Sequence, residues 1–207
     1  QAGLIPSPPL NLCPDALAAV PPAAPNVLPP GTMLQYILFS DPSDTLGSIV
    51  TISNTPEFSF DPSVMQEGIT YYIAAVAGNE LNGNVDLSDP CLSVSQGTPV
   101  IFYALPVGLI DSISPVCPVD TVLVPVTLSG APPFSFVYAI NGLSQPPVNN
   151  IATTSYQLSI PVSGPTLLTL GPVNDLFCAN NTIDSLALDI VPAPQINAGE
   201  LEDAVGG

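Results

Sequence analysis

The chain has 207 residues, of which 46% are hydrophobic and 8% are charged, and all the charged residues are acidic, giving a formal net charge of −17. Without Lys or Arg the chain has no electrostatic means of binding nucleic acid or an anionic membrane surface, so neither partner is expected. The absence of His and Lys also removes the common general bases and the Schiff-base nucleophile.

We therefore predict that the protein is not an enzyme, because no carboxylate lies in an apolar context beside a partner and no Trp is present to line a sugar cleft. The apolar content is high enough to form a folded core. No apolar run reaches the roughly 18 residues of a membrane span, so membrane insertion is not expected. The Gln1 start, without Met or a leader, is interpreted as that of a processed or excised piece of a secreted protein.

Residues 1–31 form the first predicted region, which is rich in Pro and Ala, as in IPSPPLNLC and AAVPPAAPNVLPPG. Proline fixes the backbone and removes a hydrogen-bond donor, so this composition favours an extended, polyproline-like segment over a helix. We predict that the segment packs on a neighbouring unit or links to it, or donates a strand to it.

Residues 32–104 form the second region, predicted to be a first β-sandwich. Short β-branched and aromatic runs are separated by turn sequences such as DPSDTLG and DPSVMQEG. The predicted strands are QYILFS, GSIVTIS, EFSF and TYYIAAVAG, with a last strand in CLSV or TPVIFY.

Residues 105–193 form a second predicted sandwich, with a clearer alternation of apolar and polar residues. Asn141-Gly142 predicts a tight hairpin turn that needs two positive φ angles. No helical pattern is evident, so the fold class is all-β, with two β-sandwiches in tandem after a Pro-rich segment. The inward faces are predicted at Val122, Val124, Val126 and Leu128, at Phe134, Phe136, Tyr138 and Ile140, at Tyr156, Leu158 and Ile160, and at Leu186, Leu188 and Ile190.

The aromatic run FSFVYAI lies between pairs of prolines and is interpreted as a core strand, with an aromatic platform for a ligand as the alternative. Residues 194–207 remain as a C-terminal linker or the start of a next repeat. This interpretation follows from APQINAGEL near the end of the chain, which echoes QAGLI at its start.

Four cysteines allow three pairings, and the division into two sandwiches favours the two local ones, Cys13 with Cys91 and Cys117 with Cys178. Disulfides of this kind indicate an oxidising, extracellular environment. Metal binding by the cysteines is the weaker interpretation, because no two are close in sequence and no His is present.

A resemblance to a known family is carried by CPVDTVLVPVTLSGAPPFSFVYAINGLSQPPV, SYQLSI, TLLTLGPVND and FCANNTI, and by TYYIAAVAGNELNGNVDLSDPCLSVSQGTPVIF. These runs resemble immunoglobulin-like tandem repeat modules of large secreted and cell-surface proteins of Bacteroidota, such as gliding-motility adhesins and cargo of type IX secretion. The resemblance implies an immunoglobulin-like sandwich. It implies less about function, because such modules occur in proteins of varied roles.

Four Asp-Ser/Thr-apolar tripeptides look like the sites at which Bacteroidota attach O-glycans, while Asp-Ser and Asp-Thr are also ordinary turn starters. The candidate acceptors are Thr45, Ser112, Thr121 and Ser185.

The segment NELNGNVDLSD has the oxygen-rich, turn-forming composition that calcium prefers, although it lacks the full spacing of an EF-hand loop. The candidate ligands are Asn82, Asn84, Asp86 and Asp89, and a solvated loop is the alternative. No other cofactor is expected.

The sequence as a whole predicts a structural subunit or repeat of an extracellular bacterial filament, sheath or giant surface adhesin, with copies of itself as partners. A chain without Lys or Arg offers trypsin-like proteases no cleavage site. Its low fraction of charged residues favours association through apolar surface. The alternative is a glycan- or calcium-dependent adhesive module that binds through its loops.

Overall fold

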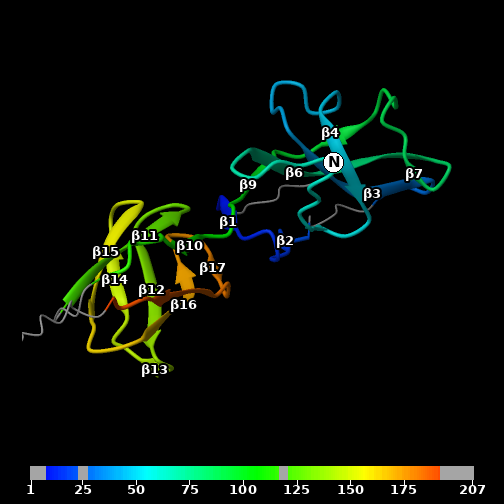
Figure 1. The fold of residues 1–207 in the computed structure, drawn as a ribbon. Coiled ribbons are helices and arrows are strands. Elements are labelled where there is room, and N and C mark those ends of the chain that lie inside the picture. The colour runs from blue at the N-terminus through cyan, green and yellow to red at the C-terminus, as the bar shows by residue number, and fades with distance from the viewer. Residues whose placement is uncertain (1–7, 23–27, 117–120, 192–207) are drawn as a thin grey trace, which may run out of the picture. The chain divides into compact units, whose positions relative to one another are not determined.

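All regular structure in the described part of the chain is β-strand. The computed structural model describes residues 8–22, 28–116 and 121–191, shown in Figure 1. Within these ranges no helix is long and apolar enough to cross a membrane. The chain divides into two compact units, one built from the residues up to Pro106 with Asn174–Asn180, the other from Val107–Val173 and the residues from Asn181 onward.

The first unit pairs a large sheet with a small one. Five strands follow the order β1-β9-β6-β3-β4, with β7 and β8 also paired to β6, and β2-β5 forms the second sheet. Strand β1 runs parallel to β9, which is the arrangement of the first and last strands in many immunoglobulin-like domains. The strands are β1 (Leu10–Leu12), β2 (Ala18–Ala19), β3 (Thr32–Phe39), β4 (Ile49–Ser53), β5 (Glu57–Phe58), β6 (Thr70–Leu81), β7 (Asn84–Val85), β8 (Ser93–Val94) and β9 (Thr98–Phe102).

Strand β6 is buried on both faces, which explains why its sequence lacks a clear alternation. One face, including Ile73 and Ala75, packs with Ala18 and Phe58 of the small sheet. The opposite face packs beneath Val85, Leu87 and Leu92, among other residues. Small alanines between the larger residues let a covering layer approach on each side.

The described residues of the predicted N-terminal connector differ from the prediction, since they are part of the first unit itself. Leu10 and Leu12 pack against the core between the two sheets, and Ala18 and Val20 are buried within it. The apolar residues between the prolines therefore supply strands β1 and β2, because the core of the first unit needs their surface.

The second unit is a two-layer sandwich whose strand order is immunoglobulin-like. Sheet β10-β11-β15 faces a sheet in which β12 and β16 pair at the centre, with β13 and β14 on β12 and β18 on β16. This is the grouping of A, B and E against C, F and G. The strands are β10 (Val107–Ile110), β11 (Thr121–Ser129), β12 (Phe134–Ile140), β13 (Leu143–Ser144), β14 (Val148–Ile151), β15 (Ser155–Pro161), β16 (Thr166–Asn174) and β18 (Asp184–Leu188). The short strand β17 (Ala179–Asn180) pairs with β16 but lies in the segment that belongs to the first unit.

The predicted inward faces of the second unit are confirmed. Val124 and Val126 of β11 are fully buried, as is Ile160 of β15, and they meet Phe134 and Phe136 of the opposite sheet in one core. Tyr138 and Tyr156 meet the ring of Phe136 edge-on. The aromatic residues of FSFVYAI thus serve the core, and the alternative of a ligand platform is wrong for Phe134 and Phe136.

The Asn141-Gly142 hairpin is also confirmed, with φ angles of 49° and 79° at the two turn residues. The all-β class with immunoglobulin-like sandwiches, predicted from periodicity and resemblance, is therefore the fold of this chain.

Candidate functional site

The predicted calcium loop contains a second tight hairpin. Asn82 and Gly83 have φ angles of 54° and 83° and connect β6 to β7. The Asn-Gly pair here carries the same turn signal as Asn141-Gly142, beside the oxygen-bearing side chains that suggest a metal.

Buried Gln35 fixes β7 against β3 and uses one of the candidate ligands. Its Nε2 donates to Asn84 Oδ1 at 3.0 Å and to Asn54 Oδ1 at 2.8 Å, while its Oε1 accepts from the backbone N–H of Val85 at 2.8 Å. Asn84 therefore positions a core amide, which leaves less of its oxygen for an ion.

The two aspartates of the segment also bind their own turns. Asp86 Oδ1 accepts from the backbone N–H and the hydroxyl of Ser88, at 2.9 and 2.6 Å. Asp89 is buried, and its carboxylate accepts from the backbone N–H of Asn79 at 2.7 Å and of Cys91 at 2.8 Å. In the described residues, no three His, Cys, Asp or Glu side chains gather as metal ligands would. Calcium binding at Asn82, Asn84, Asp86 and Asp89 stays a prediction, which calorimetric titration with CaCl₂ tests.

The carboxylate of Asp89 gives the fold a pH dependence. Hydrogen bonds from the backbone N–H of Asn79 and then of Cys91 hold the pKa of Asp89 below its ordinary value of 3.8. A folded-state pKa below the unfolded one adds stability that is complete above the unfolded value and is lost as the pH falls through the folded value.

We expect Asp89→Asn to lower the melting temperature at neutral pH, because the amide group presents N–H where the backbone also presents N–H. The difference from the wild type should narrow as the pH falls below about 4, the pKa of an unfolded aspartate, and should vanish once the pH is below the lowered folded-state pKa of Asp89. Thermal unfolding followed by circular dichroism across this range measures the effect. Asp15→Asn, at an exposed position, is the charge-matched control, and an equal loss in both variants would contradict the role of Asp89.

The disulfide differs from the predicted pairing. Cys13 is bonded to Cys178, and Cys91 is a free, exposed thiol, so a Cys13–Cys91 bond is wrong. Cys117 lies outside the described residues, but its predicted partner is already used. The reason is topological: residues 174–180 belong to the first compact unit, where Cys178 lies beside Cys13, directly after β1, and beside Tyr103, directly after β9.

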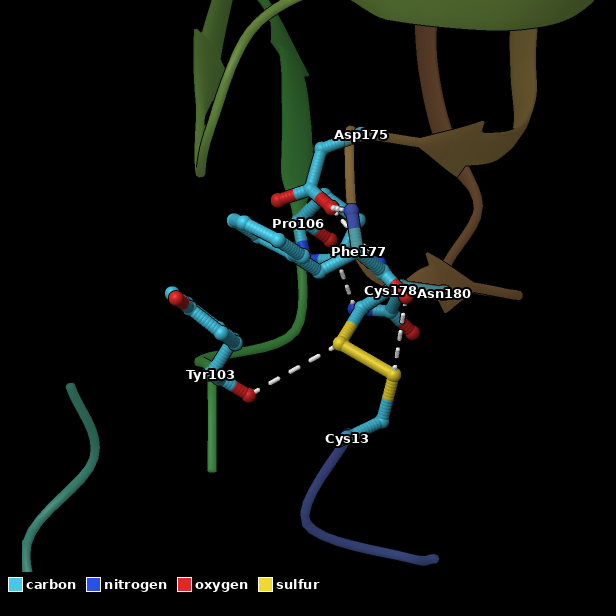
Figure 2. The surroundings of a disulfide bond; sticks show 7 residues. All are labelled: Cys13, Tyr103, Pro106, Asp175, Phe177, Cys178 and Asn180. Carbon is cyan, nitrogen blue, oxygen red and sulfur yellow. Dashed lines mark hydrogen bonds between the residues drawn. A yellow bond between two sulfur atoms is a disulfide. The ribbon is translucent and has the colours of Figure 1, made fainter. Parts of the chain in front are cut away.

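A dense set of contacts surrounds this bond, as Figure 2 shows. The rings of Tyr103 and Phe177 are stacked with centroids 3.8 Å apart. Asp175 Oδ1 accepts from the backbone N–H of Phe177 and of Cys178, at 2.8 and 2.7 Å, and Asn180 donates to the carbonyl of Pro106. The Asp175–Cys178 turn is thereby built to present Cys178 in one orientation.

The candidate glycan acceptors lie on accessible surface. Ser112, Thr121 and Ser185 are exposed and Thr45 is half-buried. Their positions allow modification, and O-glycosylation at the four sites stays a prediction that mass spectrometry of the native protein tests.

Strands β4 and β5 border a surface cleft of about 450 Å³ in the first unit. Its walls include Val50, Ile52, Phe58 and Met65. Asp61 also lines the cleft, and hydrogen bonds from the hydroxyl and backbone N–H of Ser63 hold its pKa low. The acidic rim makes the cleft unfavourable for an anionic ligand.

The second unit presents a different surface, because residues 121–174 contain no charged residue. Strand β15 lies within this stretch at the edge of the β10-β11-β15 sheet. Only residues 152–154 separate β14 from β15, which leaves no room for the strand that would cover this edge in other immunoglobulin-like domains.

Three other sheet edges of the described chain carry features that discourage pairing. The backbone N–H of Ile110 in β10 donates a hydrogen bond to the carboxylate of Asp184, and this acidic residue is also the first residue of β18. Strand β4 follows the acidic turn at Asp41 and Asp44. Strand β15 spans seven residues without charge and has a proline only at its last position. It is the candidate site for strand addition.

No protein-family model matches the chain, and no curated protein matches it. Among solved structures, a chimeric titin Z1Z2-Z1Z2 tandem is 11% identical, with a TM-score of 0.34 over 89% of this chain and 95% of that one. A Ca²⁺-stabilized adhesin that helps an Antarctic bacterium bind ice is 15% identical, with a TM-score of 0.38 over 90% of this chain and 47% of that one. The CD2-binding domain of CD58 is 9% identical, with a TM-score of 0.32 over 91% of this chain and 98% of that one. Such low scores carry no functional argument.

Proposed function

We propose that this chain is a structural, self-associating unit of an extracellular filament, sheath or surface adhesin. The observation that supports the proposal is the open edge of β15 inside a stretch of 54 uncharged residues, 121–174. An uncovered edge offers a row of backbone donors and acceptors, and pairing with a strand of another copy satisfies them.

Charge supports a second copy as the partner at this edge. Two chains that each carry −17 repel one another, and no Lys or Arg can offset the repulsion across an interface. Contact is therefore least unfavourable where carboxylates are few, and β15 itself carries none. A heterologous contact, from β15 of one copy to a different strand of the next, leaves each copy with a further free edge and generates an open chain.

The composition is consistent with a persistent extracellular role. The Cys13–Cys178 disulfide is stable in an oxidising compartment, and the lack of Lys and Arg leaves nothing for trypsin-like proteases to cleave. Extracellular location, O-glycans and a bacterial fibre are parts of the same proposal.

We expect the wild type to associate with increasing concentration and more strongly as NaCl is raised, because salt screens the repulsion between like-charged chains. A seven-residue strand pair is smaller than a standard interface, so each contact should be weak. Light scattering and negative-stain electron microscopy measure the association, and CaCl₂ at equal ionic strength shows whether a divalent ion adds more than screening.

Ser159→Lys tests the edge directly, with Leu123→Lys as its control. The two residues are register partners on adjacent strands and both are exposed, but Ser159 lies on the edge strand and Leu123 on the central strand β11. A lysine on the edge should block strand addition and reduce association at least tenfold, whereas the central lysine changes the net charge equally and leaves the edge open. Equal loss in both variants, or a wild type that stays monomeric at all concentrations, would contradict the proposal.

A further inference from the structure

The Cys13–Cys178 disulfide encloses nearly the whole folded mass of the chain. Its two cysteines are 165 positions apart, and the enclosed residues 14–177 include the buried residues of all three hydrophobic clusters except Leu188. The residues outside the loop, among those described, contribute only β1, β17 and β18 as strands.

We propose that this bond is a force bypass, which carries tension past residues 14–177 so that the chain between the two cysteines is not extended. The inference rests on the proposed structural role, in which tension enters before Cys13 and leaves after Cys178. Tension in a cross-linked chain follows the short covalent path, which here runs through two sulfur atoms. Residues 14–177 then lie outside that path, and load falls only on the contacts that β1 makes with β9 and that β18 makes with β16.

The surroundings of the bond hold its two ends together before any load is applied. The backbone N–H of Tyr103 donates to the carbonyl of Leu12, directly before Cys13, at 2.8 Å. The ring of Tyr103 stacks on Phe177, directly before Cys178. In Figure 2 a dashed line joins the carbonyl of Tyr103 to the sulfur of Cys178, so one residue directly after β9 contacts the segments that carry both cysteines.

Breaking the disulfide should release a length of chain that can be measured. A fully extended chain spans about 3.3–3.6 Å per residue. With the disulfide closed, the 165-residue separation is replaced by a Cα–Cα distance of 5.6 Å. Breaking the bond should therefore allow about 570 Å of chain to be extended once the cores unfold under load.

Single-molecule force spectroscopy tests the proposal, with handles before Cys13 and after Cys178 in a Cys91→Ala background that prevents thiol exchange at that site. The oxidised protein should show no extension event longer than about 140 Å, because only the residues outside the disulfide loop can extend. After dithiothreitol reduces the bond, forming two cysteine thiols and its own cyclic disulfide, the same molecules should extend by about 570 Å more. Oxidised molecules that extend by several hundred ångströms would overturn the proposal.

Two further measurements separate this inference from folding defects and from the proposed function. A glutamate-specific protease reaches Glu57, Glu67 and Glu80, all exposed and within the loop. After one such cut, gels without reductant should show Cys13 and Cys178 still joined in one species, and gels with reductant should show two; separation without reductant would overturn the bypass. Microscopy of the same sample tests self-association, so dispersed particles with the expected extension would reject the filament role alone.

Discussion

Loss of the Cys13–Cys178 disulfide is expected to lower the free energy of unfolding by about 5 kcal/mol, through the greater chain entropy of the unfolded state. The estimate uses the 165-residue separation and applies when both units unfold together. The loss should be smaller if the second unit stays folded, because part of the loop then remains ordered. The double variant Cys13→Ala/Cys178→Ala gives the measurement, by urea unfolding followed with circular dichroism.

The control for this prediction is Cys91→Ala, which removes an exposed thiol outside the bond and should leave the unfolding midpoint unchanged. A large and equal loss in Cys91→Ala and in the double variant would mean that Cys91, and not Cys178, is the partner of Cys13 in solution.

The second large effect is expected in the core of the second unit, where strand β11 offers a matched pair of leucines. Leu128 is 2% exposed and Leu123 is 61% exposed. Leu128→Ala should cost about 2–5 kcal/mol, because it removes buried methyl groups and leaves a cavity between the sheets. Leu123→Ala makes the same chemical change at the surface and should fall within about 0.5 kcal/mol of the wild type.

Urea unfolding of both variants compares the two costs directly. Similar values for Leu128→Ala and Leu123→Ala would show that β11 is turned over or shifted in register by one residue, since such a slip exchanges the two faces of a strand.

The parts of the fold that were predicted from sequence are those decided by neighbours along the chain. The alternation in β11 follows from the period of two in a strand, and the Asn141-Gly142 turn follows from the ease with which these residues adopt positive φ. The short strands β1 and β2 lacked such a signal, because Leu10–Leu12 and Ala18–Ala19 are too brief to show a period.

The candidate site was less predictable because it depends on which strands lie side by side. Composition suggested oxygen ligands between Asn79 and Asp89. It did not show that the side chain of Gln35, distant in sequence, donates a hydrogen bond to Asn84, or that a backbone N–H donates one to Asp89. The open edge of β15 is likewise a property of the sheet, since it results from a strand that is missing from the sheet next to it.

The sequence by itself determined the all-β class and the inward faces of the second sandwich, because hydrophobic periodicity is a property of residues close together in the chain. Only the tertiary structure decided that Cys13 joins Cys178, that residues 8–22 complete the first unit and that β15 is uncovered. These features depend on contacts between residues far apart in the chain, and the burial of shared apolar surface selects among such contacts in a way that spacing along the sequence does not reveal.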